Sequence, residues 1–230
     1  DESGAAVNFG QCCTFVTRGV FPGNRVFKID ESIDTDSAAL LGCALLTAYA
    51  ALKYVTSASE RDKGEIAIVG AGGIGLSVAA LCQAFGWSAV CVDTPEVTTY
   101  LETQDLGFQF VSTVLARAQR VGKHPIAIVC TGAHSAFELA EKLLPQNGGK
   151  MLVIGNPPYG TKVSLEIKPL LYGREIIGVG EKDVELPRDL YELVDLLKTG
   201  RLDAERLVRQ RFPLAHIQSA FEASVSGLGG

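Results

Sequence analysis

The chain has no run of Lys or Arg, and its 230 residues carry a formal net charge of −5. Nucleic acids and anionic membrane surfaces select proteins with concentrated positive charge, so the sequence predicts neither as a partner. The densest basic group is interpreted as one solvated helix face: Arg117, Arg120, Lys123 and His124. No stretch approaches the roughly 18 uncharged apolar residues of a membrane span, and we find no signal-peptide pattern.

Histidine and methionine are scarce. The three histidines, His124, His134 and His216, are each interpreted as surface or turn residues, and no His-Glu pair occurs. The only methionine is Met151 and the chain begins at Asp1, so we expect a piece of a longer protein.

The six cysteines follow no disulfide or metal-cluster spacing: Cys12, Cys13, Cys43, Cys82, Cys91 and Cys130. The last three lie inside apolar segments and are expected to be small core residues. This usage suits a reducing cytoplasm, where we expect the protein to reside. With 47% apolar and 20% charged residues, the composition is that of a soluble globular protein with one large domain, or one domain plus a fragment.

An apolar run at 66–69 leads into three glycines spaced as G-x-G-x-x-G. The run suits a buried parallel strand, because such strands are apolar on both faces. We expect Gly70 to permit the tight turn, Gly72 to let a pyrophosphate approach the backbone, and Gly75 to let the next helix pack closely. Phosphates would lie at the N-terminus of that helix, where free N–H groups favour anions. Taken alone, such a motif also serves simple strand–helix packing.

A second apolar strand, 88–92, ends in Asp93, about 20 residues after the glycine motif. A carboxylate at this place accepts hydrogen bonds from the hydroxyls of an adenosine ribose. The next residues, Thr94, Pro95 and Glu96, offer no Arg or Lys to hold a 2′-phosphate. Asp93 and Glu96 would repel one. The sequence therefore predicts NAD(H) over NADP(H).

Apolar periodicity predicts helices that alternate with strands along most of the chain. The expected helices are 37–55, 74–85, 96–106, 114–121, 135–144 and 188–199, and the expected strands are 66–69, 88–92, 110–111, 126–130, 151–154 and 176–179. In the helix 114–121 the core face is expected to consist of Val114, Leu115, Ala118 and Val121. This order is typical of an α/β protein with a doubly wound parallel sheet, the Rossmann fold.

Ligands of such sheets bind at the carboxyl ends of the strands. Those ends are rich in glycine here, at 70–75, 132, 155 and 178–180, which favours a dinucleotide site over simple packing. Residues 1–36 fit the pattern poorly. Strands are expected only at 11–17 and 26–29, and because a two-stranded unit is marginal in water, this segment must lean on another structure.

Four segments together are more specific than the glycine motif: 38–49, 69–75, 130–132 and 200–223. With them the chain resembles the zinc-type medium-chain alcohol and polyol dehydrogenases, from about Gly10 to Ala223. The resemblance implies pyrophosphate contacts for Gly70, Gly72, Gly73, Ile74 and Gly75, and a ribose contact for Asp93. It places Thr47, Thr131, Gly132 and Gly155 along the nicotinamide side. Cys43 would match one ligand of the catalytic zinc, with a buried helix thiol as the alternative.

The resemblance also implies a domain organisation. Residues 1–36 would be a remnant of a mostly β, GroES-like catalytic domain, 37–212 the NAD-binding Rossmann domain, and 213–230 a helix returning to the catalytic domain. The family's other catalytic zinc ligands, its four-cysteine zinc lobe and its final strand have no counterpart in this sequence. The catalytic residues therefore remain unknown, and we expect the chain alone to bind NAD(H) but to turn over little.

The implied function is the cofactor-binding part of an NAD-dependent alcohol or polyol dehydrogenase. The intact enzyme would transfer a hydride between NAD(H) and a primary or secondary alcohol, with zinc as Lewis acid. By analogy with the family, a homo-dimer or homo-tetramer could form through the strand 176–179. Two alternatives stay open: a stand-alone NAD(H)-binding module, and a zinc-free NADPH reductase of the same superfamily, against which Asp93 and Cys43 argue.

Overall fold

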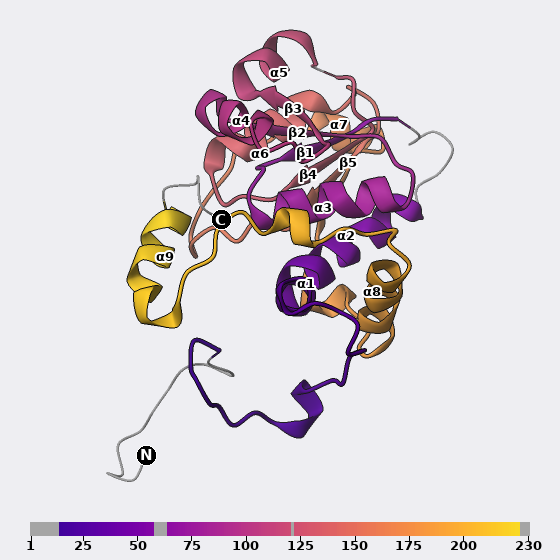
Figure 1. Ribbon diagram of the computed structural model, residues 1–230. Helices are drawn as coiled ribbons and strands as arrows, with labels where there is room; N and C mark the ends of the chain where they lie inside the picture. The colour runs from indigo at the N-terminus through magenta and orange to yellow at the C-terminus, as the bar shows by residue number, and fades with distance from the viewer. Residues whose placement is uncertain (1–13, 58–63, 121, 226–230) are drawn as a thin grey trace.

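Six parallel strands form one sheet in a computed structural model that describes residues 14–57, 64–120 and 122–225 (Figure 1). They are β1 (Ile66–Val69), β2 (Ala89–Asp93), β3 (Gln109–Ser112), β4 (Ile126–Val129), β5 (Lys150–Val153) and β6 (Glu175–Gly178). Their order is β3-β2-β1-β4-β5-β6. The chain therefore winds from the centre to one edge and then to the other, reversing between β1 and β4. The predicted doubly wound parallel sheet is confirmed.

Helices cover both faces of this sheet. On one face, Ile66 and Ile68 share a buried cluster with α3 (Gly73–Ala84), α4 (Pro95–Glu102) and the helix before β1. On the other face, Ala67 and Val69 pack with α5 (Thr113–Gln119) and α6 (His134–Leu143). Because both faces are covered, successive residues of β1 and β4 are all buried, which explains their unbroken apolar runs.

The helix before β1 is continuous from 35 to 56. It consists of α1 (Thr35–Leu40), a π-helical turn η2 (Leu41–Leu45) and α2 (Leu46–Thr56). By length and composition it could cross a membrane, so the expectation that no stretch comes near a membrane span was wrong. Here it packs against α3 and α8 (Arg188–Lys198), and Leu45, Leu52 and Val55 are buried. Core helices of globular proteins pass the same test.

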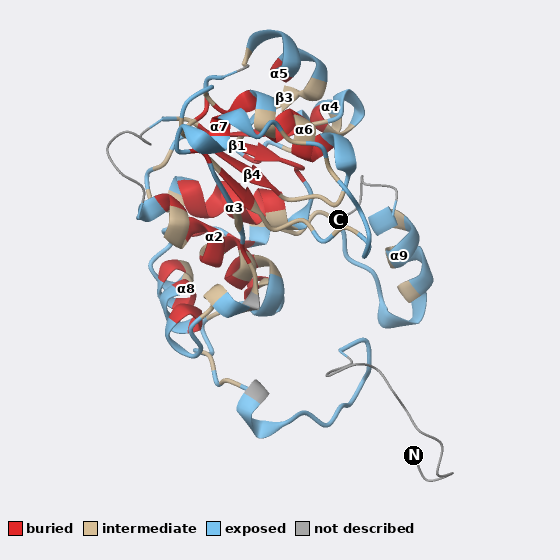
Figure 2. Cartoon of the chain, turned by 180° about the vertical axis from the view of Figure 1, so that it is seen from behind, coloured by how far each residue is buried: buried red, intermediate tan, exposed pale blue. Residues whose placement is uncertain are grey.

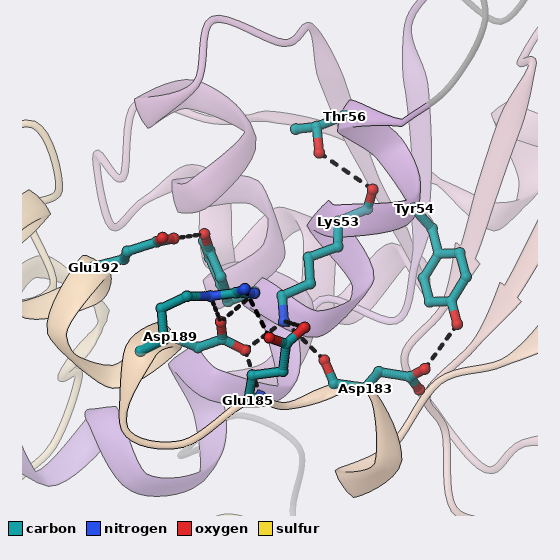
Figure 3. A network of polar contacts seen from close by, with 9 residues as sticks. Lys53, Tyr54, Thr56, Asp183, Glu185, Asp189 and Glu192 are labelled. Atoms are coloured by element: carbon teal, nitrogen blue, oxygen red, sulfur yellow. Dashed lines mark hydrogen bonds and ion pairs between the residues drawn. The ribbon is translucent and has the colours of Figure 1, made fainter.

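A buried carboxylate fastens α8 to α2 (Figure 3). The side chain of Asp189 is fully buried and accepts hydrogen bonds from the Lys53 ammonium, from the Arg188 guanidinium, and from the Glu185 N–H at 2.7 Å. Burial alone would raise the pKa of Asp189, but these bonds outweigh it and lower that pKa. Lys53 also donates to the carbonyl of Asp183 at 2.9 Å, so one ammonium group ties the approach to α8 as well as its first turn.

Short elements complete the described chain. They are η1 (Gly23–Arg25), α7 (Lys168–Leu171), η4 (Glu181–Asp183), η5 (Glu205–Leu207), η6 (Leu214–His216) and α9 (Ile217–Val225). None of the described residues of α9 is buried. Figure 2 shows α9 and the N-terminal segment as exposed extensions from the buried sheet layer.

The two strands expected near the N-terminus are not formed in the described residues. Residues 11–13 lie outside the description, and the segment 14–34 contains only η1. Val26 has extended backbone angles, φ −115° and ψ 124°, but no described strand pairs with it. An extended segment without a hydrogen-bonding partner is not a strand, so the apolar alternation alone was misleading. Phe15 instead contacts Phe221 of α9, with ring centroids 5.5 Å apart.

Helix α5 faces the sheet differently from the prediction. Val114 and Leu115 are 63% and 50% exposed, whereas Ala116 is fully buried. Val121 lies outside the described residues. The Ser112 hydroxyl accepts from the Leu115 N–H at 3.4 Å and starts the helix directly after β3. Ala116 is therefore the residue of this short helix that faces the core, and Ala118, also expected there, is exposed.

The basic group around α5 is not one solvated face. Arg120 forms an ion pair with Glu65, and His124 is only 1% exposed. The His124 Nδ1–H donates to the carbonyl of Glu65 at 2.8 Å, while its buried Nε2 has no partner among the described residues. Burial lowers the pKa of His124. The prediction of a surface or turn position was wrong for His124 and is confirmed for His134 and His216, which are exposed.

The buried imidazole makes stability depend on pH. In the unfolded chain His124 regains its ordinary pKa of 6.5, and below that pH the unfolded state binds a proton that the folded state resists. We expect this contribution to be constant above about pH 7 and to diminish as the pH falls toward about 5.5. Urea unfolding across this range measures it.

The matched variant is His124→Asn, which keeps a side-chain donor but cannot titrate. Its free energy of unfolding should fall less than that of the unaltered chain between the same pH values. Parallel curves for both proteins would contradict the assignment.

Candidate dinucleotide site

The turn between β1 and α3 is held by a backbone contact that only glycine permits. A Cβ at Gly75 would lie 1.9 Å from the carbonyl oxygen of Gly70, so a side chain cannot be accommodated there. Gly70 itself has φ +100°, a conformation that favours glycine, and its N–H donates to Val92 at 2.8 Å. The predicted tight turn and close packing of α3 are both present.

The space in front of the helix is open. A Cβ built at Gly72 or Gly73 would meet no heavy atom within 4 Å. No side chain caps α3, and its first turn contains no acidic residue. The first N–H groups of this 12-residue helix therefore face a space suited to an anion, because they lack helical partners and carry the positive end of the dipole.

Asp93 ends β2 beside this turn. One carboxylate oxygen accepts from the Ala71 N–H at 2.6 Å and the other from the Thr94 N–H at 2.7 Å. Two backbone bonds fix the orientation of the carboxylate, and each oxygen retains capacity for a further donor such as a ribose hydroxyl. The sequence placed a ribose-binding carboxylate at this position, and the geometry suits that role.

A cavity of about 310 Å³ joins the ends of the central strands. Among its lining residues are Gly70, Asp93, Thr94, Thr131, Ala133 and Arg117. Three residues predicted for the site, from β1, β2 and the end of β4, therefore meet in one cavity. Arg117, Ala133 and Thr113 were missed, because they come from α5 and the approach to α6 and carry no local motif. Larger cavities beside α7 and beside α8 contain none of the predicted site residues.

The residues predicted for the nicotinamide side also lie near strand ends, with one exception. A Cβ at Gly155 would lie 2.1 Å from the carbonyl oxygen of Thr131, and one at Gly132 would lie 3.1 Å from Pro157 Cα. Close backbone packing therefore accounts for glycine at both positions, whether or not either residue contacts a ligand. Thr47 is half-buried in α2 and does not line the 310 Å³ cavity.

Zinc does not fit the described residues. Cys43 is exposed on η2, which removes the alternative of a buried thiol, but no three His, Cys, Asp or Glu side chains gather around a common point in the described part of the chain. Cys82 and Cys91 are buried among apolar core residues as predicted, and burial raises the pKa of Cys82 to about 12. Cys12 and Cys13 lie outside the described residues.

Comparison with known proteins places this geometry in context. No family model matches the chain. The S-(hydroxymethyl)glutathione dehydrogenase of Candida maltosa is 26% identical over 234 residues, which is 96% of this chain and 60% of that protein. The alcohol dehydrogenase of Geobacillus stearothermophilus is 29% identical over 210 residues, covering 88% of this chain and 58% of its own.

Solved structures agree in fold. The benzyl alcohol dehydrogenase from Acinetobacter calcoaceticus superposes with a TM-score of 0.75 at 24% identity, over 88% of this chain and 57% of that one. An alcohol dehydrogenase zinc-binding domain protein from Burkholderia ambifaria gives a TM-score of 0.72 at 25% identity, over 87% and 55%. The chain is a partial relative of the alcohol dehydrogenases. It spans about 60% of the length of these curated relatives.

The close packing at the β1–α3 turn predicts how two glycine substitutions change the stability of the chain. Gly75→Ala should lower the free energy of unfolding by about 1–3 kcal/mol or more, because there is no space for the added methyl group. Gly73→Ala, whose methyl group meets open space on the same helix, should be neutral or stabilising by up to about 1 kcal/mol. Urea unfolding compares the two. Equal destabilisation by both would contradict the packing role of Gly75.

Proposed function

We propose that this chain is the NAD(H)-binding part of an alcohol dehydrogenase. The observation that carries the proposal is Asp93, fixed by the N–H of Ala71 in the glycine turn and lining one cavity with Gly70 and Thr131. The intact protein would transfer a hydride between NAD(H) and a primary or secondary alcohol, in keeping with the names of its relatives. NAD supplies the hydride-carrying nicotinamide when it is bound.

The chain's own residues would bind and orient the dinucleotide. The pyrophosphate would lie against the open space at Gly72 and Gly73, where the N–H groups of α3 donate to it. Both ribose hydroxyls would donate to Asp93, and the adenine would enter the 310 Å³ cavity. The nicotinamide half would extend past Thr131 toward Gly132 and Gly155. Thr47 is also proposed to contact this nicotinamide half.

Zinc remains an implication of the family. If Cys43 is a zinc ligand, the remaining ligands must come from outside the described residues, so we derive no chemical step through a metal. Residues 1–36 and 213–230 are proposed to belong with a catalytic domain. Two observations support this assignment: the chain spans about 60% of its relatives, and both segments expose large apolar side chains, among them Val20 and Phe221.

A stand-alone NAD(H)-binding module is the second candidate, favoured by the missing ligand set among the described residues. The two candidates differ in zinc content and in size. A protein purified from its natural source with bound zinc and a mass above 24.4 kDa would support the dehydrogenase. The four described cysteines are free, which suits the proposed cytoplasmic location.

Self-association through β6 is a further part of the proposal. β6 is an edge strand of the described sheet, and Ile176 on it is 40% exposed. An exposed apolar edge offers unpaired backbone groups to another strand, and a second copy related by a twofold axis would satisfy them. We expect sedimentation equilibrium to give a dimer or a larger even assembly, and Ile176→Lys to shift it toward monomer. A monomeric unaltered chain would contradict this interface.

Binding of NADH tests the main proposal directly. Isothermal titration calorimetry should show a 1:1 complex with the unaltered chain. Gly72→Val should weaken it at least about tenfold, because the new side chain enters the space proposed for the pyrophosphate, where its Cβ would meet no protein atom within 4 Å. Its urea midpoint should stay unchanged.

Gly23→Val is the matched control, since its Cβ also enters open space but on the N-terminal segment. It should bind NADH as the unaltered chain does. Absence of NADH binding by the unaltered folded chain would overturn the proposal.

A further inference from the structure

A cation reaches the adenosine end of the proposed site from a distant part of the sequence. Thr113 and Arg117 are four residues apart on α5 and therefore lie on the same face of that helix. Both line the 310 Å³ cavity together with Asp93 and Thr94. The fold thus supplies the basic side chain that the residues directly after Asp93 lack.

This cation is not used elsewhere in the described structure. Arg117 is exposed and forms no hydrogen bond or ion pair with the described residues, whereas Arg120, one turn later, is paired with Glu65. Its place in the last turn of α5 also complements the helix dipole. That effect does not require the side chain to line a cavity.

The opposing charges at this end of the cavity are fewer than the sequence indicated. Glu96 lies in the first turn of α4 and does not line the cavity. Asp93 is the acidic residue among the lining residues, and Arg117 is the basic one. The free hydroxyls of a ribose can donate hydrogen bonds to Asp93. A 2′-phosphate, in contrast, would be repelled by the Asp93 carboxylate and attracted by the Arg117 guanidinium.

We propose that Arg117 is a specificity-determining residue that gives this cavity a latent capacity for 2′-phosphorylated dinucleotides, which Asp93 counteracts. A guanidinium presents planar N–H donors that match phosphate oxygens. The cavity therefore still prefers NAD(H). With Arg117 present, however, it discriminates against NADP(H) less strongly than it would if Asp93 were its only charged residue. The inference rests on the proposed function, because it assigns the adenosine end of the same site.

Adenosine 2′,5′-bisphosphate is the probe, because it carries the 2′-phosphate but no nicotinamide. Calorimetry compares its affinity for the unaltered chain, Asp93→Ser, Arg117→Gln and the double variant, with urea unfolding as a check on folding. Asp93→Ser should bind it at least about tenfold more tightly than the unaltered chain, since the carboxylate that repels the 2′-phosphate is gone while the Arg117 guanidinium remains to pair with it. Adding Arg117→Gln should remove most of that gain.

Lys123→Gln is the matched control, because it removes the same charge from an exposed position that does not line the cavity. It should leave bisphosphate binding unchanged within about twofold, as expected of a screened surface charge. Arg117→Lys in the Asp93→Ser background should retain part of the gain, because the charge is kept while the planar fork is lost.

The outcomes separate this inference from the proposed function. If Arg117→Gln has no more effect than Lys123→Gln in either background, Arg117 is not a phosphate ligand, although NADH binding by the unaltered chain would still support the cofactor site. If Arg117→Gln already weakens bisphosphate binding in the unaltered background, the inference is supported even where Asp93→Ser fails to fold. If folded chains with and without Asp93 bind neither NADH nor the bisphosphate, both proposals fail.

Discussion

The contact between Gly75 and the carbonyl of Gly70 is the constraint on which the rest of the site depends. With a Cβ only 1.9 Å from that oxygen, any side chain at position 75 would push α3 away from the end of β1. Because α3 can begin there, the turn stays short and leaves open space in front of Gly72 and Gly73. The same turn directs the Ala71 N–H at Asp93, 2.6 Å away, so the end of β2 is tied to the end of β1. One steric condition thus sets both the open space in front of α3 and the orientation of the Asp93 carboxylate.

Much of this arrangement could be predicted because its causes are local or repeat along the chain. β1 and β4 are buried on both faces and therefore have unbroken apolar sequences, and the glycine spacing follows from the turn itself. The errors share a different cause. His124 is a polar residue of a kind common on surfaces, yet it is buried, because the Glu65 carbonyl accepts from its ring and the Leu143 carbonyl accepts from its backbone N–H. The segment around Val26 has a strand-like sequence, but a strand needs a partner that no sequence pattern within the segment supplies.

The electrostatics of the cavity are likewise a property of the fold. The stretch directly after Asp93 contains no cation, as the sequence analysis stated. The cavity, however, is lined by residues between Val69 and Leu139. Arg117 lies on α5, which follows β3 in the sequence, so this cation comes from a later part of the chain than Asp93. Cofactor preference depends on all charges around the ribose, whatever their position in the sequence. A sequence motif can therefore identify the carboxylate but cannot weigh it against a guanidinium from another element.

The lining of the cavity also bears on which parts of the chain the proposed dinucleotide binding requires. Its residues all lie between Val69 and Leu139, in the strands and helices of the sheet layer or in the turns that join them, and none comes from the exposed segment 14–34 or from α9. Those two segments touch each other through Phe15 and Phe221 and leave large apolar side chains uncovered. The proposed binding of the adenosine half thus needs no residue from either segment. Substitutions in these two segments should therefore leave dinucleotide binding unchanged, whereas substitutions among the residues that line the cavity should weaken it.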